Sequence, residues 1–161
     1  MAAAVWAVQQ PLDKIVFSSR YDDVELLGRA VVRGDGWYPA GLGLHMANGA
    51  VFGLVYANVA PVVPLPPMLR GPAAGLAEHL ALWPLVAFSD RLHPARDELP
   101  ALGGSRRAFA QAAWRHVLFG FVLGELDRRL NAEPEPAPMV PAADYSSNGH
   151  GSLEHAVSVE S

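Results

Sequence analysis

The chain has 161 residues, enough for one domain or one small helical bundle, and its 51% hydrophobic content does not by itself separate a soluble from a membrane protein. A net charge of −4 without a dense basic patch argues against nucleic-acid binding, and the lack of cysteine excludes disulfides and cysteine-ligated metals. The charges are concentrated in 13–35, 90–107 and 125–135 and are nearly absent from 36–69.

The first seventeen residues predict a partial or interfacial helix that Pro11 should end or kink. The apolar run from Met1 to Val8 is too short to span a bilayer, which takes about 20 residues. Either a longer spanning helix begins upstream of Met1 and makes a fourth span, or this is a short interfacial or re-entrant helix. The helix carries a polar cluster, which we expect at a solvated end unless the helix packs into the bundle and brings a glutamine to its polar centre. The cluster comprises Gln9, Gln10, Asp13 and Lys14.

The next segment, 19–34, predicts an amphipathic connector helix outside the membrane. Ser19 is a suitable N-cap, and acidic residues follow in the first turns, where the helix dipole favours negative charge. Val24, Leu27 and Val31 share one face at helical spacing. We therefore expect a surface helix that packs on the bundle or lies at the interface.

Three further stretches predict membrane-spanning helices over about 39–60, 72–89 and 106–130. The first contains the uncharged run Gly41–Ala60, the second has Pro84 inside it, and the third follows Ser105 as N-cap. The intervening stretch PVVPLPPMLRGP is expected to be non-helical because of its prolines. The sequence therefore predicts an all-α membrane domain over 1–130, followed by a disordered, Pro-rich acidic tail over 131–161.

The third span carries Arg115 in its middle, where a charge costs about 2.5–3.5 kcal/mol, so it should need a partner to insert. Loop charges predict the orientation. The loops 13–38 and 90–107 hold eight Lys or Arg residues and the opposite side holds three, which places these two loops in the cytoplasm and the tail outside. The alternative class is a soluble all-helical domain, which is disfavoured by the weak polar face of 41–60.

Pairs of glycines at Gly-x-x-x-Gly spacing occur in or beside each span, where small residues let helices approach closely in lipid. They are Gly49 and Gly53, Gly71 and Gly75, and Gly120 and Gly124.

Six polar residues of the spans should lie at similar depth if the three helices are antiparallel neighbours. We predict that Glu78 and Arg115 form a buried ion pair with the others hydrogen-bonded around it, as structural contacts between helices or as a proton or substrate path. Two histidines could instead ligate a metal or haem, but the ligand spacing does not favour this, and no cofactor is expected. The six are His45, Asn48, Glu78, His79, Arg115 and His116.

Four segments, QQPLDK, LHMANGAVFGLVYANVAP, LAEHLALWPLVAFSDRLHP and WRHVLFGFVLGELDRRL, resemble a family of uncharacterised multi-pass membrane proteins of high-GC actinobacteria. The resemblance covers about 5–130. It implies an inner-membrane helical bundle whose first spanning helix is longer than 1–17, and it implies no known activity.

Taken with the residues, this predicts an integral plasma-membrane protein with a structural or interaction role, in contact with lipid and with copies of itself or other membrane proteins. No catalytic motif favours an enzyme. The alternative is a small transporter or membrane enzyme that uses the polar residues at the midplane.

Overall fold

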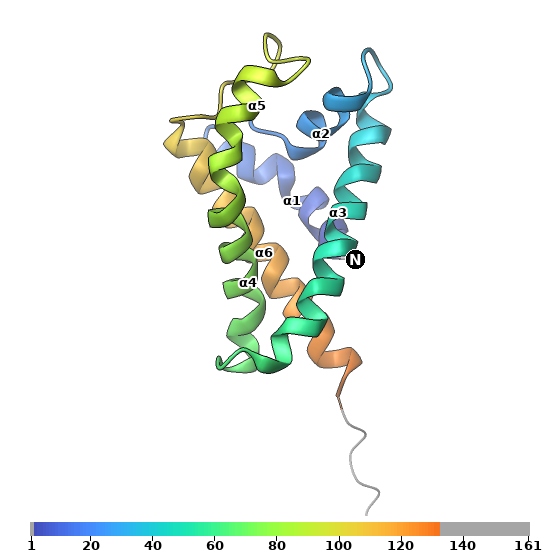
Figure 1. The fold of residues 1–161 in the computed structure, drawn as a ribbon, viewed down its shortest axis with the longest axis vertical. Helices are drawn as coiled ribbons and strands as arrows, with labels where there is room; N and C mark the ends of the chain where they lie inside the picture. Colours follow the sequence, from blue (N-terminus) through green and yellow to red (C-terminus); the bar gives the residue numbers. More distant parts are fainter. Residues whose placement is uncertain (1, 133–161) are drawn as a thin grey trace, which may run out of the picture. The chain divides into compact units, whose positions relative to one another are not determined.

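The computed structural model of the chain describes residues 2–132, and within this range every regular element is helical, which confirms the all-α prediction. The expected disordered tail lies, from residue 133 onward, outside the described residues. Six α-helices and two short 3₁₀ helices make up the described part (Figure 1). They are α1 (Ala2–Val16), α2 (Asp23–Val31), α3 (Trp37–Val59), η1 (Ala60–Val62), α4 (Pro67–Leu82), η2 (Trp83–Leu85), α5 (Val86–Leu92) and α6 (Arg106–Leu130).

The two N-terminal helices differ from the prediction at their ends. Helix α1 continues through Pro11 and ends in a turn at Ser18, which has a positive φ of 47°. Helix α2 begins at Asp23 and not near Ser19, because the carboxylate of Asp22 accepts hydrogen bonds from the backbone N–H groups of Val24 and Glu25. Asp22 is therefore the N-cap, and the connector helix is shorter than 19–34.

Helix α3 is the one helix in residues 2–132 that is long and apolar enough to cross a membrane. It runs on into η1, so that the apolar segment covers Trp37–Val62, and only 11% of its most apolar stretch is buried inside the protein. Its predicted range, 39–60, lies within this segment.

By length and composition, one of the three predicted spans is therefore supported and the other two are not. Helix α4 has 16 residues, because the chain passes at Pro84 into the 3₁₀ helix η2 before α5 begins. Helix α6 has 25 residues and begins after the predicted cap Ser105, whose side chain accepts from the N–H of Ala108, but its middle carries Arg115 and other polar residues.

The proline-rich connection is also more helical than predicted. Only its first part forms a turn, and α4 begins at Pro67. Proline fits the first turn of a helix, where its missing N–H would have no partner, and the later Pro72 is accommodated inside α4.

Helices α4 and α6 pack with their backbones in close contact along a glycine seam. A methyl group built on Gly71 would lie 2.0 Å from the carbonyl oxygen of Gly120, and one on Gly75 would lie 2.1 Å from that of His116. Gly124 lies against Gly71 in the same seam. Glycine is therefore required at these positions, because any larger side chain would clash with the backbone of the partner helix.

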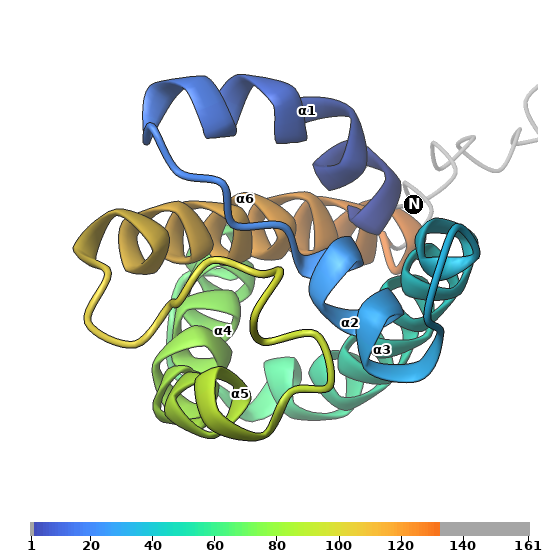
Figure 2. The ribbon, with the colours of Figure 1, turned by 90° about the horizontal axis from the view of Figure 1, so that it is seen from above.

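A second glycine contact, which the sequence reasoning missed, joins α2 to α3. A methyl group on Gly28 would lie 2.0 Å from the carbonyl oxygen of Trp37, so α2 packs directly on the start of α3. Figure 2 shows α1 on one side of α6 and α4 with α5 on the other, with α3 standing apart beside α2.

Candidate functional site

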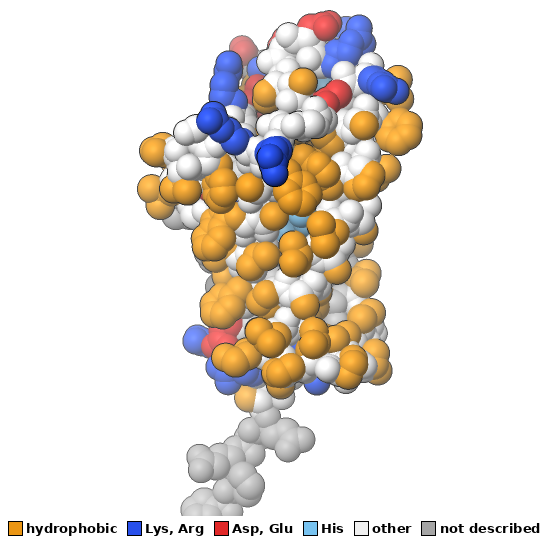
Figure 3. Space-filling view, turned by 90° about the vertical axis from the view of Figure 1, so that its left-hand side faces the viewer, with side chains coloured by type: hydrophobic (Ala, Val, Ile, Leu, Met, Phe, Trp, Pro, Cys, Tyr) orange, Lys and Arg blue, Asp and Glu red, His pale blue; other side chains and the backbone are white. Residues whose placement is uncertain are grey.

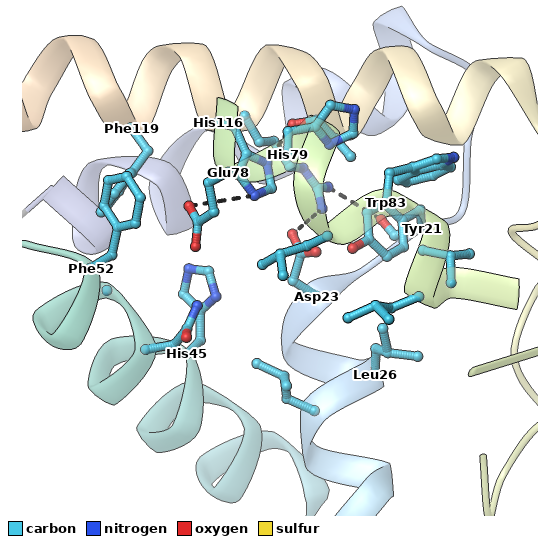
Figure 4. A pocket seen from close by; sticks show the side chains of 18 of the residues that line it. Tyr21, Asp23, Leu26, His45, Phe52, Glu78, His79, Trp83, His116 and Phe119 are labelled. Carbon is cyan, nitrogen blue, oxygen red and sulfur yellow. Dashed lines mark hydrogen bonds and ion pairs between the residues drawn. The ribbon is translucent and has the colours of Figure 1, made fainter. Parts of the chain in front are cut away.

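A cavity of about 360 Å³ is lined by residues of α2 to α6 and by Tyr21 (Figure 4). Its apolar wall includes Leu26, Phe52, Trp83 and Phe119. The structure brings to it all six polar residues that the sequence singles out, because the three long helices run antiparallel and present these residues at similar heights. Those six are His45, Asn48, Glu78, His79, Arg115 and His116.

The guanidinium of Arg115 is the centre of a buried ionic network. Its Nε and Nη2 donate to the two carboxylate oxygens of Asp13 at 2.6 and 2.8 Å, and its Nη1 donates to Asp23 at 2.8 Å. Nη2 also donates to the backbone carbonyl of Tyr21 at 3.2 Å. The predicted ion pair of Arg115 with Glu78 is therefore wrong, since α1 and α2 supply two nearer carboxylates.

The expectation that Asp13 lies at a solvated helix end is also wrong. This residue is 2% exposed because α1 packs against α6. Besides Arg115, its carboxylate accepts from Gln9 Nε2 at 2.8 Å and from Gln111 Nε2 at 2.7 Å. The alternative in which the first helix packs into the bundle thus describes the observed contacts of Gln9, whose side chain also accepts from Trp114 Nε1 at 3.3 Å.

The segment between α1 and α2 holds two groups with shifted titration. Burial, with the neighbouring Asp23, raises the pKa of the Tyr21 hydroxyl well above its usual value. Burial would also raise the pKa of Asp22, but hydrogen bonds from Lys14 Nζ at 2.6 Å and from the backbone N–H of Glu25 outweigh it and lower that pKa. Near neutral pH, Tyr21 is therefore a neutral phenol and Asp22 a carboxylate.

Glu78 and His116 face each other inside the cavity, with Oε2 and Nε2 3.9 Å apart. The other ring nitrogen of His116, Nδ1, lies 2.8 Å from the carbonyl oxygen of Ala112. Because a carbonyl oxygen only accepts, Nδ1 must carry a proton and donate it. In the neutral imidazole the lone pair of Nε2 therefore points to the side of Glu78.

His79 is buried in a cluster of rings. It is 2% exposed, and its ring centroid lies 4.7 Å from that of Phe109 and 5.2 Å from those of Trp83 and His116. Its Nε2 is buried and has no hydrogen-bond partner among the described residues. Such an atom costs free energy unless a bound molecule or water satisfies it.

Helix α3 contributes the opposite wall. His45 and Asn48 both line the cavity, and Figure 4 shows His45 pointing across it to the side of Glu78. Further along α3, the ring of Phe52 packs edge-to-face on Phe119 with centroids 5.6 Å apart. This ring contact joins the α3 wall of the cavity to the α6 wall.

Within residues 2–132, no group of three or more His, Asp or Glu side chains is arranged to hold a metal ion. His79 and His116 pack ring against ring, with their planes tilted by 47°, and do not face each other across a gap. This geometry differs from the bis-histidine arrangement considered from the sequence.

Sequence reasoning missed Tyr21, Asp23 and Trp83 as parts of the site. Asp23 reads in the sequence as an acid at a helix start, and its second role depends on α2 lying across the bundle next to Arg115. Trp83 reads as an apolar residue of a span. The one signal in the sequence that could have suggested Asp13 and Asp23 is that a buried arginine needs carboxylate partners.

The arrangement combines an apolar, partly aromatic cavity with a few converging polar groups, which is typical of a small-molecule binding site. Its polar lining includes two carboxylates, three imidazoles, an amide, a phenol and the guanidinium of Arg115, so it can hold a proton or bind a charged group. Comparisons with protein-family models, with curated proteins and with solved structures found no match to this chain.

Proposed function

We propose that this chain is an integral plasma-membrane protein whose three long helical segments, α3, α4 to α5, and α6, cross the bilayer around a small-molecule binding cavity. One observation carries the proposal: the described part of the protein is inverted relative to a soluble protein. The largest fully buried side chains are Arg115, His79, Gln111 and Asp13, whereas twenty-four large hydrophobic side chains are exposed. In lipid, exposed apolar residues are favourable, and polar residues turn inward to find partners.

The spacing of the charged residues near the helix ends supports the same proposal. On α6, Arg107 and Glu125 are eighteen residues apart, about 27 Å at the rise of an α-helix, and the ionisable residues between them face the interior. Arg70 and Asp90 are about 30 Å apart along α4 to α5 by the same measure. Both lengths are close to the hydrocarbon thickness of about 30 Å. Figure 3 shows hydrophobic side chains over the middle of one face and charged ones near its two ends.

The composition of a helix includes its polar side chains whichever way they point. A helix whose polar side chains face the interior of a bundle can therefore present an apolar face to lipid although its overall composition is polar. In α4, Glu78 is 15% exposed and His79 is 2% exposed, and in α6, Arg115 is 1% exposed. The faces that would meet lipid lack these residues. The proposal therefore keeps three spans although only α3 passes alone.

The proposed topology follows from the loops. The loops before α3 and before α6 lie at one end of the bundle, and the turn before α4 lies at the other end with the C-terminus of α6 (Figure 1). By the positive-inside rule, the end with 13–38 and 90–107 is cytoplasmic and Leu130 lies outside. Helix α1 would be re-entrant: its Asp13 reaches the buried Arg115 from the cytoplasmic side.

The cavity favours a carrier or receptor for small molecules over a purely structural role. Its volume of about 360 Å³ falls within the range of about 300–1,000 Å³ for ligand sites. A helix contact that serves only packing would leave no cavity, as in the α4–α6 seam, where the two backbones touch at glycines. The unpartnered Nε2 of His79 supports the same choice.

Topology can be tested cleanly because the chain has no native cysteine. Single cysteines would replace exposed residues at the two ends: Asp35 and Asp97 at one, Pro64 and Asn131 at the other. In intact cells, a membrane-impermeant maleimide should label Pro64→Cys and Asn131→Cys, and it should label Asp35→Cys and Asp97→Cys only after lysis. Recovery of the unmodified protein in the soluble fraction without detergent would refute the membrane proposal.

A charge on the outer surface gives an independent test. Val51, in the middle of α3, is 62% exposed. In lipid, Val51→Arg should reduce membrane integration, since a central arginine costs about 2.5–3.5 kcal/mol. Asp97→Arg, in a loop, is the matched control and should leave integration unchanged. Equal recovery of the two variants would indicate that α3 faces water.

A further inference from the structure

We propose that the cavity binds a lipophilic organic ammonium ion, with Glu78 as its counter-ion, in exchange for the single proton that Glu78 and His116 hold between them. This rests on the proposed function of the cavity as a small-molecule site, and it names the chemical class of the ligand.

The first step is the charge of the cavity. Arg115 is the one Lys or Arg side chain lining it, and its guanidinium is already bonded to both Asp13 and Asp23. Glu78 therefore remains as a carboxylate that no guanidinium or ammonium group neutralises among the described residues. An anionic ligand would face an excess of carboxylates, whereas a cation would reduce it.

The second step is the proton. Because Nδ1 of His116 donates to Ala112, the lone pair of its Nε2 and the carboxylate of Glu78 would repel each other at 3.9 Å if neither carried a proton. One proton, on either group, converts this repulsion into attraction. This geometry favours a pair that shares one proton when the cavity has no cation.

The other titratable side chains that line the cavity around the Glu78–His116 pair come from several elements. His45 faces it from α3, His79 from α4, Asp23 and Tyr21 from α2 and the segment before it, and Arg115 from α6, while α5 contributes Val86 and Ser89, which do not titrate. Arg115 and Asp23 are paired with each other. The Glu78–His116 pair is therefore the acidic group of the cavity that can exchange its proton for another cation.

The third step is the wall around this pair. Tyr21, Phe52, Trp83 and Phe119 line the cavity, and the faces of aromatic rings attract cations, by about 2 kcal/mol or more when water is excluded. The other apolar residues of the wall are aliphatic. Such a lining suits an ammonium group carried on an apolar body and does not suit a hydrated metal ion.

The fourth step is the unpartnered nitrogen of His79. In the tautomer in which Nε2 carries the lone pair, it can accept a hydrogen bond from an ammonium N–H, which would satisfy the buried atom. A protonated amine should therefore bind at least as well as a quaternary ammonium ion of the same shape. When the cation enters, the carboxylate of Glu78 becomes its counter-ion, and the displaced proton leaves to the solvent.

The experiment uses the full chain purified in detergent and three probes of nearly equal shape. They are the ammonium form of N,N-dimethylbenzylamine, benzyltrimethylammonium, and neopentylbenzene, which is the neutral carbon isostere. Titration calorimetry in two buffers of different ionisation enthalpy measures affinity and proton release together. We expect both cations to bind with release of about one proton each, affinity that rises with pH, and binding at least about tenfold tighter than that of the neutral isostere.

Glu78→Gln should weaken cation binding by at least about tenfold and abolish proton release. Glu125→Gln, at the far end of α6 and outside the cavity, is the matched control and should bind like the unmodified protein. If Glu78→Gln fails to fold, the proton release and pH dependence of the unmodified protein still test the idea. Equal binding of all three probes, binding without proton release, or no binding of either cation would overturn this inference, and the cysteine-labelling result would show separately whether the membrane proposal stands.

Discussion

Replacing Arg115 by leucine should destabilise the protein strongly, because it leaves a buried carboxylate without a cation. The Asp13 side chain is fully buried, and its two oxygens bond to the guanidinium at 2.6 and 2.8 Å. Removing one partner of a buried ion pair costs about 3–5 kcal/mol, because the other charge stays desolvated. Asp23, whose side chain is 16% exposed, can recover water more easily, so most of the loss should come from Asp13.

The assay is the free energy of unfolding of Arg115→Leu in mild detergent, measured beside two further variants. Asp13→Asn combined with Arg115→Leu should recover part of the loss, since it removes the stranded charge and keeps the shape of the side chain. Arg128→Ala is the control: this residue pairs with Glu125 at the surface, where solvent screens the interaction, so its loss should leave the free energy of unfolding nearly unchanged. A loss below about 1 kcal/mol for Arg115→Leu, or recovery by Glu78→Gln in place of Asp13→Asn, would refute the assigned pairing.

Two further predictions test packing and pH dependence. Gly71→Ala places a methyl group 2.0 Å from the carbonyl oxygen of Gly120 and should lower the free energy of unfolding by about 1–3 kcal/mol. Gly43→Ala is the control, because Gly43 has open space around it, and this change should raise the free energy of unfolding by about 0.5–1 kcal/mol. Equal effects of the two changes would contradict the α4–α6 seam. Because the pKa of Asp22 is lowered in the folded state, its contribution is present above the usual value of 3.8 and is lost as pH falls through the lower folded value. Thermal melts below about pH 4 should show this loss, and Asp22→Asn should reduce the pH dependence there while keeping the N-cap; an unchanged dependence would contradict the Lys14–Asp22 pair.

Helical class and the extent of α3 and α6 could be predicted from the sequence because these features depend on local chemistry. Ser105 caps α6 through a side chain three residues from its bonded N–H, and the apolar run of α3 is continuous. The end of α1 and the start of α2 were less predictable. Asp22 and Ser19 are both good caps, and only the pairing of Asp22 with Lys14 distinguishes them.

The six polar residues that the spans contribute to the cavity were predictable, but their pairing was not. Antiparallel helices of similar length bring residues at equal distance from the loops to the same depth, which is why His45, Glu78 and His116 meet. Pairing depends on rotation about each helix axis and on the path of the N-terminal segment. Because α1 packs against α6, Asp13 pairs with Arg115, and the partner of Glu78 is His116.

The two N-terminal helices each supply one carboxylate to the buried centre of the described part. A lone arginine in the middle of α6 opposes insertion by about 2.5–3.5 kcal/mol, which nearly offsets the gain from the apolar residues around it. Its two carboxylate partners come from α1 and α2, both of which precede α3 in the chain. In the proposed bilayer, α6 is thus stable only together with α1 and α2. The charge of Arg115 is neutralised only when Asp13 and Asp23 have packed against it. The same pairing withdraws Arg115 from Glu78, so the structural network and the proposed cation site depend on each other.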